Sequence, residues 1–263
     1  MLKITDHRLE HCEFIQAADH GGDFTEHNPQ LIILHYTAGS TFESAKTTLT
    51  TDDDTFVSSH LLIGRDGRIA QLVDFNKIAW HAGKSAYQGL ESLNNHAIGI
   101  ELVNPGYVRD GFTDGETIRA THKNGGPERD WFTYTQEQLL ATVEVCEALF
   151  NAYPTICNVI GHDDCAPDRK VDPGPAFPWK QFNDMLYGEL PSNIDRIDKW
   201  FTWNLPSADI NRVCEPLYQQ AAELARFVVN NTPYSAEQTI ALRKLRECLM
   251  YCVSALTAPR RSA

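Results

Sequence analysis

Three apolar runs in the first two thirds of the chain predict buried strands. Residues 31–37 read LIILHYT and residues 96–103 read HAIGIELV, and neither shows the regular polar alternation of a strand with one solvated face. Continuous runs of this length are typical of strands covered on both faces. A shorter run, CNVIGH, ends at His162. The pattern therefore predicts strands that present His35 and His162 near their ends and Glu101 within the apolar interior of the second run.

A turn signal and two helical patterns accompany these strands. SSHLLIGRDGRIAQLV, residues 58–73, holds two short β-runs around an Asp-Gly pair, which favours a β-hairpin. FESAKTTLT and TQEQLLATVEVCEALFNAY are predicted helices, and Thr135 with Gln138 forms a capping box at the start of the second. Residues 105–133 are polar and rich in glycine and are predicted to form a long loop. Strands mixed with helices predict an α/β fold through about residue 190.

After Pro191 the apolar pattern changes to two helical stripes joined by NNTPYS. The first stripe comprises Ile210, Val213, Leu217, Ala221, Leu224 and Val228, and the second comprises Leu242, Leu245, Leu249, Cys252 and Leu256. Spacings of three or four residues are typical of amphipathic helices, so the tail is predicted to be an antiparallel α-hairpin. A lone hairpin cannot cover both of its stripes, and it must therefore dock on the body or self-associate.

The charge of the chain limits the kinds of molecule that it is expected to bind. The 263 residues carry a net charge of −12, which argues against a protein that binds DNA or RNA. Residues 195–263 hold nine Lys and Arg against seven Asp and Glu, net +2, so residues 1–194 hold 14 against 28, net −14. The C-terminal segment, residues 195–263, is therefore expected to have a weakly positive surface, in contrast to the strongly negative surface of residues 1–194.

The cysteines and the apolar segments of the chain predict the cellular compartment of the protein. Seven cysteines without CxxC spacing indicate reduced thiols packed as small apolar side chains. No stretch approaches the roughly 18 apolar residues of a membrane helix, and MLKITDHRLEHCEF lacks the apolar run of a secretory signal. We expect a protein that is made in the cytoplasm and stays there, with no membrane partner, unless something releases it.

The segment GHDDCAPDRKVDPGP carries the candidate chemistry. His35 and His162 close apolar runs, and Asp172 follows in an extended, proline-braced loop. Two imidazoles and one carboxylate with a fourth position open to water form a common catalytic zinc arrangement, in which the pKa of that water falls from about 15.7 to about 7. Glu101 is then a natural general base, and Lys170 can stabilise an oxyanion. The alternatives are that each histidine is structural and that the glutamate forms an ion pair.

Five stretches together resemble one enzyme family. LHYTA, SSHLLI…DGRIAQLV, AWHAGKS, IGIELVNPG and GHDDCAPDRKVDPGPAFPW are similar to the zinc-dependent N-acetylmuramoyl-L-alanine amidase type 2 family, closest to its AmiD-like members, over about residues 28–185. The resemblance implies a mixed central β-sheet flanked by helices. It implies one Zn²⁺ per chain held by His35, His162 and Asp172, with Glu101 as base and Lys170 stabilising the tetrahedral intermediate. The implied reaction cleaves the amide between the lactyl group of N-acetylmuramic acid and L-alanine in peptidoglycan.

The same resemblance assigns further residues. Trp80, His81 and Gly83 would line the substrate groove, and His60 matches the Ser-Ser-His segment of the family without a fixed role. Cys165 departs from the apolar branched residue that is usual in the family, which is a conservative change of volume. Asp164 and Arg169 are expected to brace the loop internally.

The tail resembles a second family. LARFVVNNTPYSAEQTIALRKLRECLMYCVSAL is similar to the small helical-hairpin domain of phage proteins that sequester cyclic oligonucleotide signals of bacterial anti-phage defence. Arg243, Lys244 and Arg246 would form a cationic patch that suits a cyclic di- or trinucleotide. The alternative is a docking hairpin, or one that makes a homo-oligomer, with a solvated basic face.

These observations predict a domain plan and a function. We expect a zinc amidase catalytic domain at residues 1–190, a linker at 191–204 and a ligand-binding or oligomerising hairpin at 205–258. The predicted protein is a phage endolysin that reaches the cell wall after the membrane is opened, with regulation through the hairpin. The alternatives are a cytoplasmic amidase that recycles muropeptides, a cysteine hydrolase using Cys165 with His162, and a non-catalytic peptidoglycan-recognition module. The last would be expected to lack a metal ligand.

Overall fold

The computed structural model describes residues 2–25, 28–51, 56–112, 115–187 and 208–231, together with residues 241, 242, 244, 245, 248, 249 and 252. The chain divides into two compact units, Met1–Leu186 and Tyr187–Ala263. The sheet and the candidate site lie in the first unit, and the helical tail forms the second.

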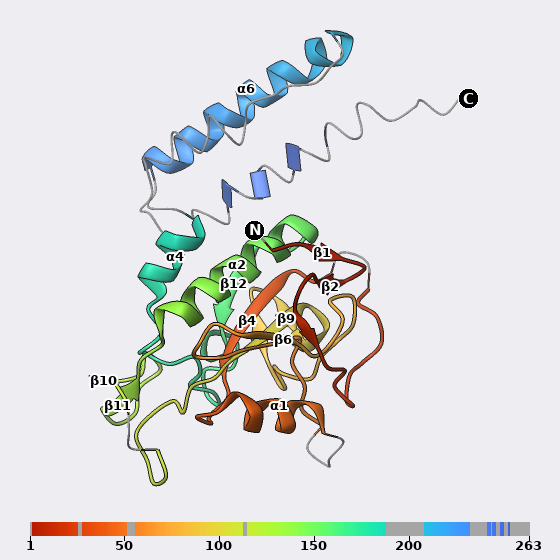
Figure 1. Cartoon of the computed structure of the whole chain (residues 1–263). Helices are drawn as coiled ribbons and strands as arrows, with labels where there is room; N and C mark the ends of the chain where they lie inside the picture. The colour runs from red at the N-terminus through yellow and green to blue at the C-terminus, as the bar shows by residue number, and fades with distance from the viewer. Residues whose placement is uncertain are drawn as a thin grey trace. The chain divides into compact units, whose positions relative to one another are not determined.

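A six-stranded mixed sheet forms the centre of the first unit (Figure 1). Its order is β12 (Asn158–Gly161), β4 (Leu31–Tyr36), β9 (Ala97–Leu102), β5 (Leu61–Ile63), β6 (Ile69–Gln71) and β3 (Glu13–Phe14). The pairs from β12 to β5 are parallel, β5 and β6 are antiparallel, and β6 and β3 are parallel. The central strands are buried along almost their whole length, as continuous apolar runs predict. The prediction of an α/β fold with a mixed sheet is confirmed.

Helices cover both faces of this sheet. In Figure 1, α1 (Phe42–Thr50) and α2 (Gln136–Ala152) lie on opposite sides of it. On one side, Phe42 and Leu49 of α1 pack with Leu62 of β5 in a buried apolar cluster. Further helices in this part of the chain are η1 (Leu93–Asn95), α3 (His162–Cys165) and α4 (Trp179–Tyr187).

Local signals at element ends are confirmed in part. The Asp-Gly pair joins β5 to β6, and Gly67 adopts a φ of +80° that favours glycine. Thr135 caps α2 by accepting a hydrogen bond from the backbone N–H of Gln138. The Gln138 side chain does not return to this cap, since its Oε1 atom has no hydrogen-bond partner. Its Nε2 atom donates to the carbonyl groups of Ile63 and Val103. The predicted capping box is therefore only half formed.

Among the described residues, three two-stranded sheets lie outside the central one. They are β1 (Ile4–Thr5) with β2 (Arg8–Leu9), β7 (Ala86–Tyr87) with β8 (Leu90–Glu91), and β10 (Thr117–Ala120) with β11 (Arg129–Phe132). The last pair falls within residues 105–133, so the prediction of one long loop there is wrong. Trp131, which pairs with Ile118, is 2% exposed and supplies apolar contact that glycine content alone does not reveal.

The second unit contains α6 (Ala208–Asn231). Ala221, Ala222 and Ala225 of this helix pack against Leu242 and Leu249 in one apolar cluster. Members of the two predicted stripes therefore contact each other. The predicted linker at 191–204 lies outside the described residues.

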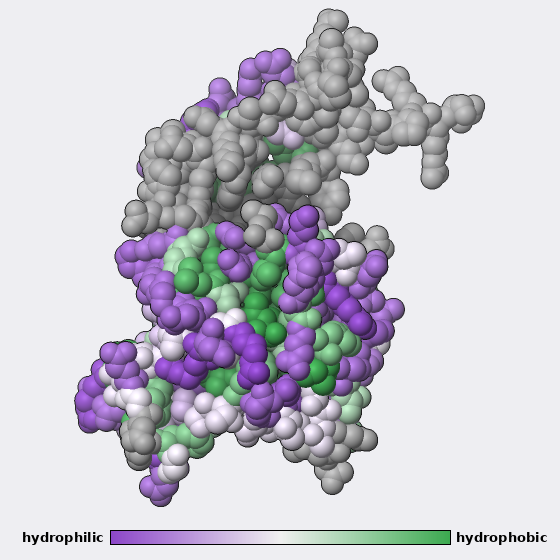
Figure 2. Space-filling model, viewed as in Figure 1, coloured by the Kyte–Doolittle hydropathy of each residue, from purple (hydrophilic) through white to green (hydrophobic). Residues whose placement is uncertain are grey.

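The surface of the first unit carries both polar and apolar residues (Figure 2). Hydrophilic residues cover much of the face of the first unit seen in Figure 2, with apolar residues between them. Among the helices that the structure describes, none is long and apolar enough to span a membrane.

Candidate active site

Three buried side chains from distant parts of the sequence converge at one end of the sheet. His35 is the fifth residue of β4, and His162 follows β12 directly. Since these strands are parallel neighbours with Gly161 opposite Leu34, the two histidines lie side by side. Asp172 arrives on the loop after α3, where its carbonyl group accepts a hydrogen bond from the backbone N–H of Asp163.

The ligand atoms of these residues form a small triangle. His35 Nδ1 lies 2.9 Å from His162 Nδ1 and 3.1 Å from Asp172 Oδ2, and His162 Nδ1 lies 3.0 Å from the same oxygen. All three residues are buried, with exposed fractions of 1%, 1% and 7%. Burial and the neighbouring His162 lower the pKa of His35 to about 4, so its imidazole is neutral at neutral pH.

The donor set fits a divalent metal ion. His162 Nε2 lies 3.1 Å from the carbonyl oxygen of Ala82, which can only accept, so the single proton of a neutral His162 ring is on Nε2. His162 Nδ1 then presents a lone pair to the ionised carboxylate of Asp172. Two acceptors only 3.0 Å apart repel each other unless a cation lies between them. Two imidazole nitrogens and one carboxylate oxygen are ligands that Zn²⁺ takes in catalytic sites.

Glu101 lies next to this triangle. It pairs in register with His35 across the parallel strands β4 and β9, and it lines the same pocket. Its Oε2 atom is buried and has no hydrogen-bond partner. Burial raises the pKa of Glu101 to about 8, with a further increase from Asp172 and a partly compensating decrease from Lys170. The carboxyl group is therefore positioned to take up and release a proton near neutral pH.

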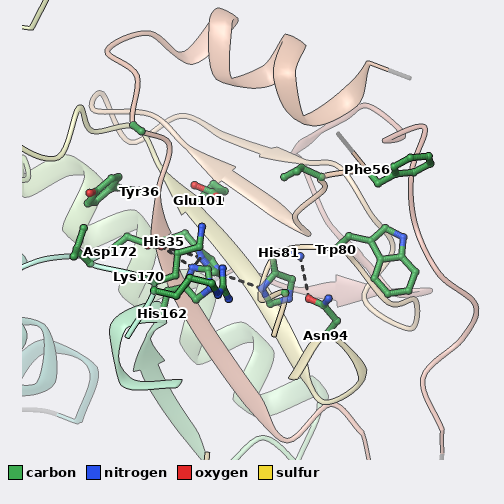
Figure 3. Close-up of a pocket in the computed structure, with 15 residues that line it drawn as sticks. His35, Tyr36, Phe56, Trp80, His81, Asn94, Glu101, His162, Lys170 and Asp172 are labelled. Carbon is green, nitrogen blue, oxygen red and sulfur yellow. Dashed lines mark hydrogen bonds and ion pairs between the residues drawn. The ribbon is translucent and has the colours of Figure 1, made fainter. Parts of the chain in front are cut away.

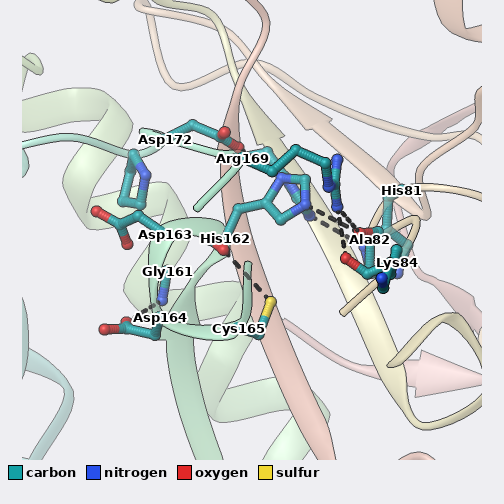
Figure 4. A network of polar contacts seen from close by, with 12 residues as sticks. His81, Ala82, Lys84, Gly161, His162, Asp163, Asp164, Cys165, Arg169 and Asp172 are labelled. Carbon is teal, nitrogen blue, oxygen red and sulfur yellow. Dashed lines mark hydrogen bonds and ion pairs between the residues drawn. The ribbon is translucent and has the colours of Figure 1, made fainter. Parts of the chain in front are cut away.

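Lys170 and Arg169 extend from the segment that carries Asp172. Lys170 is half-buried and lines the pocket. Arg169 Nη2 donates to the carbonyl oxygens of Ala82 at 2.7 Å and Lys84 at 2.9 Å (Figure 4). Arg169 therefore ties its loop to residues 82–84 and is not the internal brace that was expected.

Asp164 does act within its own segment. Its Oδ2 atom accepts a hydrogen bond of 2.8 Å from the backbone N–H of Gly161 (Figure 4). Its Oδ1 atom accepts a hydrogen bond from Lys123 Nζ. The expected internal brace is therefore present at Asp164.

The pocket has a volume of about 750 Å³. Its lining, part of which is labelled in Figure 3, is His35, Tyr36, Ala38, Phe56, Val57, Trp80, His81, Gly83, Asn94, Glu101, His162, Arg169, Lys170, Val171 and Asp172. The apolar lining residues Phe56, Val57, Trp80 and Val171 are 64%, 40%, 38% and 38% exposed. Exposed apolar groups beside buried charged ones suit a ligand with both apolar and polar parts.

The predicted substrate residues separate into two groups. Trp80 and Gly83 line the pocket, and so does His81, although it is only 8% exposed. His60 is fully buried and is not among the lining residues. His60 Nδ1 accepts from the backbone N–H of Gly99, and Nε2 donates to the carbonyl group of Lys77. The structure therefore gives His60 contacts with backbone groups and does not bring it to the pocket.

Several lining residues were missed from the sequence. Phe56 and Val57 belong to none of the stretches that carry the resemblance, and Tyr36 lies in one of them, LHYTA, without an assigned role. Asn94 accepts hydrogen bonds from the backbone N–H groups of His81 and Ala82 through Oδ1. No sequence signal identifies this contact, because it joins segments that are brought together by folding.

Cys165 lacks the surroundings of a nucleophile. It is 2% exposed, it is absent from the pocket lining, and its thiol donates to the carbonyl group of His162 rather than to the ring. Burial raises the pKa of the Cys165 thiol to about 12, so the thiolate is disfavoured. These contacts argue against the cysteine hydrolase alternative.

The proposed cationic patch of the tail is largely outside the structure. Arg243 and Arg246 lie outside the described residues, and Lys244 lies within them. The prediction that these three residues bind a phosphate-bearing ligand is therefore untested.

Similarity to known proteins relates the chain to one enzyme family. Residues 25–175 match the family model described as N-acetylmuramoyl-L-alanine amidase. The 1,6-anhydro-N-acetylmuramyl-L-alanine amidase AmpD of Escherichia coli is 42% identical over 134 residues, which are 51% of this chain and 60% of that protein. The N-acetylmuramoyl-L-alanine amidase AmiD of Escherichia coli is 33% identical over 192 residues, or 69% of this chain and 62% of that protein. The chain thus spans less than two thirds of the length of these curated relatives.

Two solved structures resemble the fold. An AmpD crystal structure matches with a TM-score of 0.54 and 32% identity, covering 71% of this chain and 99% of that one. The complex of AmiD from Escherichia coli with anhydro-N-acetylmuramic acid-L-Ala-D-γ-Glu-L-Lys matches with a TM-score of 0.50 and 26% identity, covering 95% of this chain and 97% of that one.

Proposed function

Because the chain belongs to the N-acetylmuramoyl-L-alanine amidase family, we propose that it hydrolyses the amide between N-acetylmuramic acid and the L-alanine of a stem peptide. One observation carries the proposal. The ligand atoms of His35, His162 and Asp172 lie 2.9–3.1 Å apart beside the unpartnered carboxyl oxygen of Glu101. A non-catalytic module would need neither this complete ligand set nor a base placed next to it.

The residues have separate tasks in this reaction. His35, His162 and Asp172 would hold a zinc ion, which supplies a water of pKa about 7 at its open position when bound. Glu101 accepts a proton from the attacking water and delivers it to the nitrogen of the leaving L-alanine. A pKa of about 8 for Glu101 keeps both transfers feasible near neutral pH. Lys170 places a positive charge beside the substrate oxygen that gains negative charge.

For the substrate, the comparisons favour the recycling alternative over the endolysin. AmpD is named for 1,6-anhydro-N-acetylmuramyl-L-alanine, and the AmiD complex contains an anhydro-muramyl peptide. We propose that this chain prefers such soluble muropeptides to intact sacculi. The apolar pocket residues Phe56, Val57 and Trp80 support this, because they offer surface to a sugar ring. Release by a phage and action after membrane opening stay predictions without further support.

The role of the second unit is also a proposal. The alignment with AmiD covers 95% of this chain, whereas the first unit ends at Leu186, so the aligned part extends into the tail. This supports a helical unit that accompanies an amidase domain. Binding of a cyclic oligonucleotide and self-association through the hairpin stay predictions.

The experiment compares two substrates after metal removal and after zinc is restored. Purified protein is incubated with anhydro-N-acetylmuramic acid-L-Ala-D-γ-Glu-L-Lys or with intact sacculi, and mass spectrometry identifies the products. We expect free peptide with an N-terminal L-alanine only when zinc is present, at least tenfold faster from the soluble substrate. Products cleaved between sugars, or equal rates with chelator and with zinc, would contradict the amidase assignment. Faster release from sacculi would contradict the substrate preference alone.

A further inference from the structure

The ring of His81 makes two contacts inside the protein, although its sequence context predicts contact with substrate. His81 Nδ1 lies 2.9 Å from His35 Nε2 (Figure 3). His81 Nε2 lies 3.2 Å from the carbonyl oxygen of Ala97. The two histidine rings meet edge to face, with their centroids 5.0 Å apart. Both nitrogens of His81 are therefore engaged before any substrate arrives.

Proton counting along this chain of contacts gives a single arrangement for neutral rings. The carbonyl oxygen of Ala97 can only accept, so His81 carries its proton on Nε2. His81 Nδ1 is then an acceptor, and it can only receive the proton of His35 Nε2. A neutral ring has one N–H group, so His35 Nδ1 is left with its lone pair. That atom is the one that belongs to the triangle with His162 and Asp172.

We propose that His81 is a positioning residue that selects the tautomer of His35 in which Nδ1 is free to bind the metal ion. This inference rests on the metal site of the proposed function. It assigns His81 to the metal ligand rather than to the substrate. The physical reason is that the opposite tautomer of His35 would direct an N–H group at the cation and leave two lone pairs facing each other at Nε2 and His81 Nδ1.

The surrounding backbone is shaped to hold the His81 ring. A Cβ atom added at Gly99 would lie 2.5 Å from His81 Cγ, so a larger residue at this point of β9 would displace the ring. Asn94 Oδ1 accepts from the backbone N–H groups of His81 and Ala82 at 3.0 Å and 2.7 Å. The ring and the turn that carries it are therefore both fixed.

This one turn orients two metal ligands. The side chain of His81 accepts from His35, and the carbonyl group of the next residue, Ala82, accepts from Nε2 of His162. Both imidazoles consequently direct Nδ1 toward Asp172. His60 provides a contrast, since it is an equally buried histidine whose two nitrogens contact only backbone groups and no metal ligand.

Two substitutions at position 81 separate this role from simple packing. His81→Asn places an amide oxygen near the position of Nδ1 and retains the acceptor for His35. His81→Phe retains the volume of the ring and removes the acceptor. We expect His81→Phe to weaken Zn²⁺ binding by about 10–100-fold, measured by competition with a chelating indicator, and His81→Asn to stay within about fivefold of the natural chain. Trp80→Phe, at the adjacent pocket position, is the control and should not change Zn²⁺ affinity.

A packing role predicts the reverse order, with His81→Phe tolerated and His81→Asn impaired, and that order would overturn the proposal. Long-range ¹H–¹⁵N spectra of the zinc-loaded natural chain provide a test that needs no variant. They should show His35 and His81 both protonated at Nε2. A proton on His35 Nδ1, or zinc bound through Nε2, would refute the inference. Failure of the natural chain to bind zinc at all would instead refute the metal site of the proposed function.

Discussion

Two ionisable side chains on adjacent strands show opposite pKa shifts with the same main cause. Burial raises the pKa of Glu101 to about 8 and lowers the pKa of His35 to about 4. In both residues burial favours the neutral form, because a low dielectric disfavours charge. The neutral imidazole of His35 therefore keeps a lone pair at neutral pH, whereas the Glu101 carboxyl group is mostly protonated below pH 8 and can accept a proton only in its ionised fraction.

The shift of Glu101 makes the stability of the metal-free protein depend on pH. Between pH 4.5, the ordinary pKa, and pH 8, the folded protein keeps a proton on Glu101 that the unfolded chain releases. The contribution of Glu101 to the free energy of unfolding therefore falls as pH rises through this window. We expect Glu101→Gln to melt at a higher temperature than the natural metal-free chain at pH 8, and at nearly the same temperature at pH 4.5.

The same variant tests catalysis. Glu101→Gln should lower the rate of amide hydrolysis by about 10²–10⁴-fold, the usual contribution of a general base, while Zn²⁺ still binds. Glu144→Gln, at an exposed position of α2, is the matched control and should alter neither the melting temperature nor the rate. Equal melting curves for Glu101→Gln and the natural chain at pH 8 would show that the carboxyl group is not desolvated.

At the scale of elements, the site depends on how loops are tied to the sheet. Strands β4, β9 and β12 bring His35, Glu101 and His162 together through their register. The loop that carries Asp172 is held by contacts to other segments, and Arg169 makes two of these to the carbonyl groups on either side of Gly83. Gly83 adopts a φ of +57°, and a Cβ atom added there would lie 3.2 Å from Arg169 Nη2. A larger residue at position 83 would therefore crowd the guanidinium group that ties the loop.

Removal of this tie should loosen both loops. We expect Arg169→Ala to lower the free energy of unfolding by about 1–3 kcal/mol, because two hydrogen bonds from a charged donor are lost, and to weaken Zn²⁺ binding because Ala82 also holds His162. Urea denaturation with and without zinc measures both effects. Lys180→Ala removes an exposed i,i+4 ion pair with Asp184 and should cost less than about 0.5 kcal/mol. Similar losses in the two variants would contradict a specific role for Arg169.

At the scale of the whole molecule, three buried neutral histidines make the fold sensitive to acid. Burial lowers the pKa of His35 and His60 to about 4 and lowers that of His81 well below its ordinary value of 6.5. Below pH 6.5 these histidines bind protons in the unfolded chain and stay unprotonated in the folded chain. The contribution of these three histidines to the free energy of unfolding is therefore complete above pH 6.5 and is lost as pH falls toward 4.

We expect the melting temperature of the metal-free protein to fall steadily between pH 6.5 and pH 4. Each histidine changes the free energy of unfolding by up to about 1.4 kcal/mol per pH unit. Between pH 6.5 and pH 4.5 the opposite change from Glu101 cancels about one of these three contributions. Calorimetry at a series of pH values measures the slope. Added Zn²⁺ should raise the melting temperature at pH 7 and progressively less at lower pH, because the ligands must be deprotonated. A melting temperature that is constant from pH 6.5 to pH 4 would contradict this account.

The strands, and the titratable side chains that interrupt or close them, can be read from local patterns in the sequence. Continuous apolar runs identify β4, β9 and β12, and the titratable residues that interrupt or close these runs are His35, Glu101 and His162. Such patterns are local, since burial on both faces of a strand requires apolar residues at successive positions. The proline-braced segment likewise reveals Asp172 and Lys170, and both line the pocket.

The orientation of these groups follows from contacts that form when the chain folds. Three sets of hydrogen bonds join residues far apart in the sequence. His81 contacts His35, and Arg169 donates to Ala82. Gln138 donates to the carbonyl groups of Ile63 and Val103 and not to its own helix end. The tautomer of a buried histidine such as His35 depends on which carbonyl group ends its hydrogen-bond chain. No local pattern encodes that, because the choice is made by backbone groups that every residue carries and that only folding brings together.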